Sequence, residues 1–372
     1  MAIPSLAMIP SGYKDGKVYS VLPTNGDGDF TFSRGSNATR VNKDGLIETV
    51  TGDTPRLDYT DSSCPSLLLE PQSTNLITYS EDFSQSAWKK SNIDLLTLTS
   101  EIAPNGTSNS VYNFKGDDSN LFIDSQSINV EYTISFYVKS NSKGKDNFKL
   151  RLGSGISEFT ATNEWVKYSY KATPTSQVFG ISSNGIDSDV LIWGAQLEEQ
   201  SYATSYIPTN GTIATRLTDE CVNTSAGSVI GQTEGTLYAD VNFVGVTEAI
   251  TNQIFFLREQ GSNNGYLFAG FYQGKLNCGM RVGGSLLFDT FFSSALTKGR
   301  YKIAIAYKSG DTKIYVNGVQ TGFKNNSFGV TNFAEILLTG SAGTNQLGDI
   351  NREFKLYETR LTDSELQELT TI

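Results

Sequence analysis

Short runs in which apolar and polar residues alternate, each closed by turn residues, recur along most of this chain. In the middle of the chain they cover residues 132–138, 148–152, 165–170 and 189–193. Later runs of the same kind cover residues 235–241, 253–257, 265–272, 275–282, 286–291, 301–307, 313–316, 319–322 and 354–357. Alternation with period two is typical of strands with one buried face, and the middle runs are not separated by any sustained helical period. Many turn-bounded strands of this length predict an all-β chain.

The length of 372 residues predicts more than one sandwich. Residues 1–75 are irregular and rich in turn formers, which predicts an extended N-terminal arm. Residues 76–207 and 228–372 each carry a strand series, whereas 208–227 is rich in Thr, Asn and Gly without a hydrophobic period, as in a linker. The predicted fold is therefore all-β, an extended arm followed by two β-sandwich (jelly-roll) domains.

Two turn dipeptides predict hairpins. Asp44-Gly45 lies between the alternating halves of residues 38–50. Asn317-Gly318 joins two alternating runs in the C-terminal series. Such dipeptides supply the positive-φ positions that two-residue hairpin turns need.

The last residues predict a short helix over 363–369. Thr362 and Glu365 have the spacing of a capping box, and Leu366 and Leu369 fall on one helical face. We expect this helix to lie against a sheet as a terminal latch.

The absence of histidine excludes several function classes. Imidazole is the usual general base near neutral pH and the commonest transition-metal ligand, so Ser-His-Asp, Cys-His and HExxH chemistry is excluded. Paired carboxylates could still act. However, Asp117-Asp118 and Glu198-Glu199 are adjacent, so each pair would point to opposite faces of a strand. The chain is predicted not to be an enzyme, with a glycan hydrolase that uses an Asp/Glu pair as an alternative.

Charge, cysteine spacing and hydrophobicity argue against three further properties: nucleic-acid binding, a cysteine metal site and a membrane span. The net charge of -10 and a pI near 4.7 oppose nucleic-acid binding. Cys64, Cys221 and Cys278 lack metal-ligand spacing, which predicts reduced thiols. No long apolar run predicts a membrane span, and no signal peptide is expected from the N-terminal residues.

Two ordered phrases resemble a signature of bacteriophage and prophage virion proteins. The first covers residues 32–42, 45–48, 55–59, 65–76 and 79–83, followed by Trp88. The second covers residues 193–198, 203–209 and 215–216. The middle module also resembles a carbohydrate-binding-module jelly roll.

A third phrase, residues 315–318 and 353–366, resembles the end of a laminin-G-like, concanavalin A-like lectin domain. These resemblances imply a virion structural protein of a tail fibre, head fibre, baseplate or capsid decoration. It would be assembled in the host cytoplasm, would dock to other virion proteins through residues 1–75 and would display lectin-like domains to host-surface polysaccharide. A purely architectural protein without a sugar site is the alternative.

The resemblance to phage fibres also implies a homo-oligomer, commonly a trimer. No coiled-coil heptads occur, so a trimer would form through the arm or through sandwich faces.

Four residues are candidates for carbohydrate contact. Trp88 lies on a loop-like stretch beside lysines and could stack on a sugar, although the tryptophans are also suited to core packing. In the C-terminal series, one of Phe271 and Tyr272 must point away from the core, where Tyr272 could form a patch with Arg281 and Asp289. A solvated face or a subunit contact is the plainer reading of that patch.

Calcium is the one cofactor to consider, because laminin-G-like domains often hold it. Asp240 and Asp349 are the candidate ligands. No D-x-D-x-D-G loop occurs, so no cofactor is expected.

Overall fold

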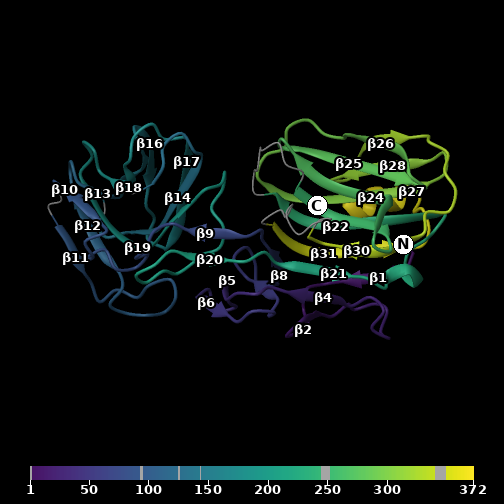
Figure 1. Ribbon diagram of the computed structural model, residues 1–372, viewed down its shortest axis with the longest axis horizontal. Helices are drawn as coiled ribbons and strands as arrows, with labels where there is room; N and C mark the ends of the chain where they lie inside the picture. The colour runs from purple at the N-terminus through teal and green to yellow at the C-terminus, as the bar shows by residue number, and fades with distance from the viewer. Residues whose placement is uncertain (1, 93–94, 125, 143, 244–251, 340–348) are drawn as a thin grey trace. The chain divides into compact units, whose positions relative to one another are not determined.

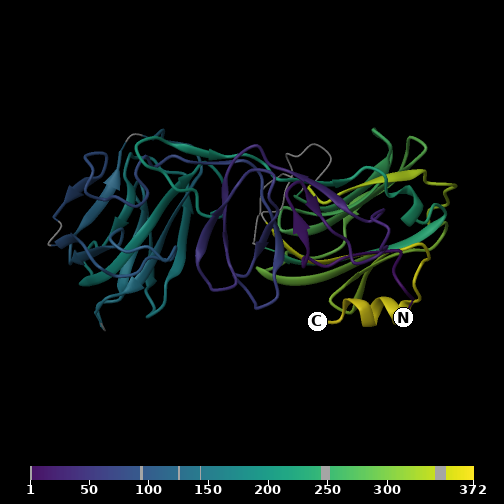
Figure 2. The ribbon, with the colours of Figure 1, turned by 90° about the horizontal axis from the view of Figure 1, so that it is seen from below.

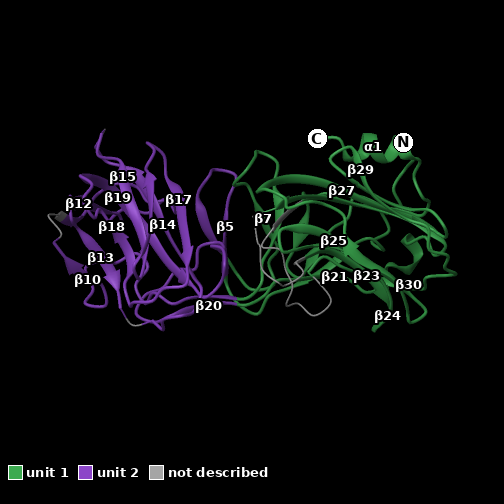
Figure 3. Ribbon diagram, turned by 90° about the horizontal axis from the view of Figure 1, so that it is seen from above, with its two compact units in different colours: residues 1–37, 50–72, 217–372 green, residues 38–49, 73–216 purple. Residues whose placement is uncertain are grey.

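The computed structural model describes the chain apart from residues 1, 93–94, 125, 143, 244–251 and 340–348. It is nearly all β, which confirms the predicted fold class. The described residues form two compact units (Figure 3). Unit 1 comprises residues 1–37, 50–72 and 217–372, and unit 2 comprises residues 38–49 and 73–216.

Unit 1 is a sandwich of two antiparallel sheets (Figure 1). The eight-stranded sheet has the order β29-β28-β27-β22-β31-β8-β7, with β1 paired to β31. Its strands are β1 (Leu6–Met8), β7 (Arg56–Asp58), β8 (Ser66–Leu69), β22 (Glu234–Phe243), β27 (Gly299–Lys308), β28 (Thr312–Val316), β29 (Val319–Lys324) and β31 (Asp349–Tyr357).

The nine-stranded sheet has the order β2-β3-β4-β21-β30-β23-β24-β25-β26. Its strands are β2 (Tyr13–Lys14), β3 (Lys17–Val18), β4 (Phe30–Ser33), β21 (Glu220–Asn223), β23 (Asn252–Glu259), β24 (Ser262–Tyr272), β25 (Lys275–Val282), β26 (Ser285–Phe291) and β30 (Phe333–Leu337). A 3-10 helix, η1 (Ala226–Val229), follows β21.

The core of unit 1 uses the alternate residues of both sheets. Leu237 and Ile305 come from the eight-stranded sheet, and Leu267 and Met280 from the nine-stranded sheet; all four are fully buried in one cluster. The period-two pattern of the sequence therefore places one face of each strand in a shared interior.

The predicted terminal helix is present as α1 (Asp363–Thr370), the yellow helix beside the C-terminus in Figure 2. Thr362 and Glu365 form the complete capping box. Leu366 and Leu369 pack with Tyr238 in a second cluster of the eight-stranded sheet. The helix is thus fixed by its cap and by its apolar face.

Unit 2 contains two five-stranded antiparallel sheets. One has the order β10-β13-β18-β15-β16 and the other β11-β12-β19-β14-β17. The strands of the first are β10 (Lys89–Ser91), β13 (Asn120–Ile123), β15 (Asn147–Leu152), β16 (Gly155–Thr160) and β18 (Phe179–Ser182). Those of the second are β11 (Leu95–Leu98), β12 (Tyr112–Gly116), β14 (Tyr132–Ser140), β17 (Val166–Ala172) and β19 (Ser188–Glu198). Phe114, Phe136 and Phe148 are fully buried in its core.

Two strand pairs complete unit 2. β9 (Ser73–Asn75) pairs with β20 (Ala214–Arg216). β5 (Ala38–Val41) and β6 (Ile47–Val50) form the predicted hairpin, with Gly45 at a φ of 79°. Thr39 Oγ1 donates to the Tyr206 carbonyl at 2.5 Å, which ties the hairpin to unit 2.

The division of the chain differs from the predicted arm and linker. Within residues 1–75, strands such as β1 and β8 pair inside unit 1 and leave no separate arm among the described residues. Residues 208–227 contain β20 and β21 and are not an unstructured linker. Short strands without a complete hydrophobic face gain their order from partners that are distant in the sequence, which local patterns do not reveal.

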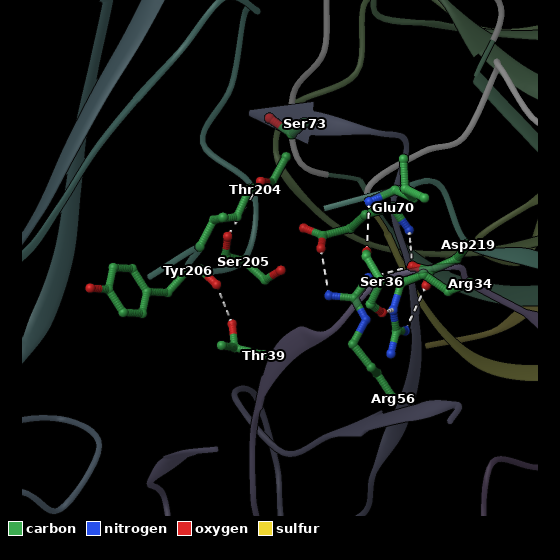
Figure 4. A network of polar contacts seen from close by, with 12 residues as sticks. Arg34, Ser36, Thr39, Arg56, Glu70, Ser73, Thr204, Ser205, Tyr206 and Asp219 are labelled. Atoms are coloured by element: carbon green, nitrogen blue, oxygen red, sulfur yellow. Dashed lines mark hydrogen bonds and ion pairs between the residues drawn. The ribbon is translucent and has the colours of Figure 1, made fainter. Parts of the chain in front are cut away.

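Three residues of the first resemblance phrase, Arg34, Arg56 and Glu70, take part in a buried ion network in unit 1, drawn in Figure 4. Asp219 accepts from Arg34 at 2.9 Å and also from Arg56, whose other terminal nitrogen donates to Glu70 at 2.7 Å. All four side chains are at most 4% exposed. The network joins three segments of the first resemblance phrase to Asp219, which is distant from them in the sequence. We therefore assign it a structural role.

No helix among the described residues is long and apolar enough to span a membrane.

Candidate functional site

A pocket of about 610 Å³ opens in unit 2. Its walls combine two carboxylates, two amides, two tyrosines and three hydroxyl side chains with two apolar residues. The lining residues are Tyr79, Glu81, Asp82, Ser84, Leu98, Asn109, Ser110, Tyr112, Pro208, Thr209 and Asn210. Concave sites with a few convergent polar groups are the usual places for ligands.

Backbone contacts hold two walls of the pocket together. Tyr79 and Asn210 form an isolated antiparallel bridge. Beside it, the Gly211 N–H donates to the Thr78 carbonyl at 2.7 Å, and the Ser80 N–H donates to the Thr209 carbonyl at 3.3 Å. The segment after β9 and the segment before β20 are thereby locked side by side, although about 130 residues separate them.

Asp82 is fixed in the wall by several donors. Its Oδ1 accepts from the Tyr112 hydroxyl at 2.8 Å and from the Ser84 hydroxyl at 2.6 Å, while Gln85 Nε2 donates to Oδ2 at 2.7 Å. Burial raises the pKa of Asp82, but these hydrogen bonds outweigh burial and lower the pKa to about 2. Asp82 is therefore an anion at neutral pH.

Glu81 has a different environment. Its Oε1 accepts from the Tyr206 hydroxyl at 2.9 Å, and that hydroxyl is also 2.7 Å from Ser80 Oγ. The Tyr206 ring packs on Trp193, with ring centroids 4.6 Å apart. Burial raises the pKa of Glu81, although hydrogen bonds from Tyr206 and Trp193 oppose the rise.

Thr209 offers an unused hydrogen-bonding group. Thr209 lines the pocket and is only 9% exposed, yet among the described residues its Oγ1 finds no hydrogen-bond partner. The Thr209 backbone is held by Ser80, whose Oγ accepts from the Thr209 N–H at 2.8 Å. A buried hydroxyl without a partner is costly unless a ligand or water supplies one.

Trp88 does not lie on the surface. It is 3% exposed, its Nε1 donates to the Tyr79 carbonyl at 2.9 Å, and its ring packs on Phe83 and Phe136. Its prediction as a sugar-stacking residue is wrong, because the ring fills the core of unit 2. It still supports the pocket by fixing the backbone of Tyr79.

Tyr272, Arg281 and Asp289 lie in the nine-stranded sheet of unit 1. Their neighbours in the alternating pattern, such as Phe271 and Met280, belong to the core, so these three side chains lie on the outer face. Phe271 and Tyr272 thus divide between core and outer face as the sequence predicts.

The three residues do not gather at one point. Arg281 is in register with Tyr266 and lies over its ring at 5.3 Å, whereas Tyr272 is six positions further along β24 and stacks on Phe291. Asp289 pairs in register with Gly279 and accepts from Asn277 at 3.0 Å. Arg281 and Asp289 are diagonal neighbours. Along the strand direction, Tyr272 is about 20 Å from the register position of Arg281 and about 13 Å from that of Asp289.

Of the two calcium candidates, the structure describes the side chain of Asp240 alone. Asp240 is 3% exposed and accepts a bidentate pair of hydrogen bonds from Arg300, at 2.8 and 2.5 Å. The side chain of Asp349 lies outside the described residues. Within the part of the chain that the structure describes, no group of three or more His, Cys, Asp or Glu side chains could hold a metal ion.

The sequence patterns did not predict the pocket, although much of its wall belongs to the two resemblance phrases. Tyr79, Glu81 and Asp82 belong to the first resemblance phrase, and Pro208 and Thr209 to the second. The available signal was that these phrases contain carboxylates and tyrosines outside any alternating run. Their convergence depends on the pairing of distant segments, which no local pattern encodes.

Comparisons with solved structures give partial likenesses. One similar structure is the carbohydrate-binding module CBM40 of the Ruminococcus gnavus IT-sialidase, bound to α2,3-sialyllactose. The two chains are 18% identical, the match covers 40% of this chain and 87% of the module, and the TM-score is 0.34. A second is domain 4 of AbnA, a GH43 extracellular arabinanase from Geobacillus stearothermophilus, in complex with arabinotriose. It is 16% identical, the match covers 46% of this chain and 84% of that domain, and the TM-score is 0.34. A third is the receptor binding domain of botulinum neurotoxin mosaic serotype C/D. It is 13% identical, the match covers 40% of this chain and 39% of that chain, and the TM-score is 0.34. No protein-family model and no curated protein matches the chain.

Proposed function

We propose that this chain is a non-catalytic carbohydrate-binding protein whose glycan site is the pocket of unit 2. The observation that carries the proposal is the composition of that pocket: carboxylates, amides and two tyrosines, together with a Thr209 hydroxyl that has no partner in the described part of the chain. Sugars present hydroxyl groups that need donors and acceptors, together with apolar faces that pack on aromatic rings.

One of the two carboxylates, Asp82, is poorly suited to acid–base catalysis. Asp82 is held ionised by several donors, with a pKa of about 2, so it cannot supply a proton near neutral pH. Glu81 is its neighbour in sequence and already accepts from Tyr206. These contacts favour fixed binding groups over a hydrolytic pair.

We further propose that the protein is a bacteriophage virion component that uses this pocket for host-surface adhesion. The support is the resemblance of its two signature phrases to virion proteins, together with the finding that both phrases contribute residues to the pocket. The architectural alternative assigns the same phrases to packing alone, and the buried network around Asp219 favours that assignment for residues 32–42 and 55–59.

The test uses the full chain and a panel of surface polysaccharides and oligosaccharides from candidate host bacteria, with binding measured by biolayer interferometry. Asn210→Trp should abolish saturable binding, because Asn210 is an exposed residue of the pocket wall. Asn163→Trp is the matched control, since Asn163 is exposed in unit 2 and does not line the pocket. Binding that survives Asn210→Trp, or a folded protein that binds no glycan, overturns the proposed site.

Two further measurements separate the alternatives. Dose-dependent inhibition of phage adsorption by the full chain would support adhesion, whereas a folded, oligomeric protein that does not inhibit would favour the architectural role. Release of reducing ends from a bound polysaccharide would instead identify a hydrolase.

A further inference from the structure

We propose that the pocket of unit 2 selects sugars without a negative charge, namely neutral or amino sugars, and rejects acidic sugars such as sialic and uronic acids. The inference rests on the proposed glycan-binding function and assigns its ligand class. It follows from the charged groups in the wall and from the way they are fixed.

Every charged residue that lines the pocket is acidic. Glu81 and Asp82 are the two, and among the described lining residues there is no Lys or Arg. A cation touches the wall from outside: the exposed Lys90 donates from its Nζ to the Ser84 carbonyl, at 3.4 Å. An acidic sugar entering the pocket would therefore meet carboxylates without a guanidinium or ammonium partner in the lining.

The wall cannot readily turn its negative charge away from a ligand. Asp82 is held by Tyr112, Ser84 and Gln85, and Glu81 is held by Tyr206. Fixed carboxylates are acceptors only, so they suit sugar hydroxyls or an ammonium group. A second anion at the same place would be repelled, and the repulsion is stronger where water is displaced.

The neutral groups of the pocket fit the same ligand class. Thr209 is nine-tenths buried, and its Oγ1 has no partner among the described residues, so this hydroxyl can donate to or accept from a sugar hydroxyl. Asn109 and Asn210 are exposed amides in the wall that can do both. None of these three groups supplies a positive charge.

The experiment compares sugars that share a backbone and differ in charge. The full chain is titrated by calorimetry, at one pH and moderate salt, with the cationic tetramer of glucosamine and the neutral tetramer of N-acetylglucosamine. Neutral hits from the host glycan panel are compared with their sialylated or uronic-acid counterparts. We expect each acidic counterpart to bind at least about tenfold more weakly than its neutral parent.

Variants test whether the carboxylates of the pocket wall cause the preference for uncharged sugars. Glu81→Gln should reduce the preference for uncharged over acidic sugars severalfold, and Asp82→Asn should do the same if circular dichroism shows that it folds. Glu164→Gln removes one charge from an exposed position of unit 2 outside the pocket and should leave the preference unchanged. Lys90→Gln should leave it unchanged or increase it.

The outcomes distinguish the two proposals. Equal or tighter binding of acidic sugars, lost in Asn210→Trp, overturns the charge selection but keeps the glycan site. A preference that persists in Glu81→Gln and in folded Asp82→Asn also overturns it. Failure to bind any sugar of any charge overturns the proposed function itself.

Discussion

The hydroxyl of Tyr112 donates to Oδ1 of Asp82 at 2.8 Å and joins the start of β12 to the segment that follows β9. Both residues line the pocket of unit 2. The contact therefore has two roles, since it holds two walls together and keeps Asp82 ionised.

Loss of this contact should lower stability in a pH-dependent way. Tyr112→Phe is expected to reduce the free energy of unfolding by about 1–2 kcal/mol at pH 7. Asp82 has a folded pKa of about 2 against an ordinary value of 3.8, so its ionised form stabilises the fold above about pH 4. That stabilisation is lost as the pH falls from about 4 towards 2, so the difference between the two proteins should shrink over this window.

The measurement is urea unfolding of both proteins between pH 2 and 7, with a carboxyl NMR titration of Asp82. In Tyr112→Phe the pKa of Asp82 should rise. A stability difference that grows towards low pH would contradict the assignment. Tyr170→Phe is a control, because Tyr170 is a half-buried tyrosine of β17 that does not line the pocket.

Thr209→Val should separate binding from stability. Valine has nearly the same shape and removes a buried hydroxyl that has no partner among the described residues, so the free energy of unfolding should be unchanged or higher by up to about 1 kcal/mol. Glycan affinity should fall about five- to tenfold through loss of one hydrogen bond. Ser135→Ala is the comparison, since Ser135 Oγ is also buried without a described partner but lies outside the pocket. Equal affinity of Thr209→Val and the parent would exclude a role for the hydroxyl.

Asp219→Asn should be severely destabilising. Arg34 and Arg56 are both fully buried, and the change removes the carboxylate charge that pairs with both of them. Breaking a buried pair of this kind costs about 3–5 kcal/mol. Asp61→Asn removes a partly exposed ion pair with Arg352 and should cost less than about 1 kcal/mol. The stabilities of the two variants are compared by thermal unfolding. Similar losses of stability in both would show that the buried network contributes little to the stability of unit 1.

The helical latch can be tested in the same way. Leu366 is fully buried between α1 and the eight-stranded sheet, so Leu366→Ala should cost about 2–5 kcal/mol. Ile372→Ala, at an exposed position near it in the chain, should be nearly neutral. If unfolding of unit 1 were unaffected by Leu366→Ala, the helix would not contribute to its stability.

The sequence allowed the strands to be predicted where one face is buried, because a half-buried strand must alternate. The stretch 132–138 lies within β14, and the capping box of Thr362 and Glu365 marks the start of α1. These signals are local, with period two or a spacing of three residues.

What could not be predicted depends on contacts between distant segments. The position of Trp88 in the core follows from packing on Phe136, and the strands of residues 1–75 follow from partners such as β31. The pocket arises in the same way, because Asp82 and Thr209 meet only after their two segments have paired. The resemblance phrases implied lectin-like domains, but the position of the pocket could be found only from the fold.

The discontinuous make-up of unit 1 has a consequence for its biosynthesis. Ser5 and its partner Leu356 are 351 residues apart. At the usual pace of translation, β1 leaves the ribosome roughly 20 to 70 seconds before β31 can pair with it. Residues 73–216 are complete much earlier, so most of unit 2 can fold on the ribosome while the first strands of unit 1 still wait with unpaired edges.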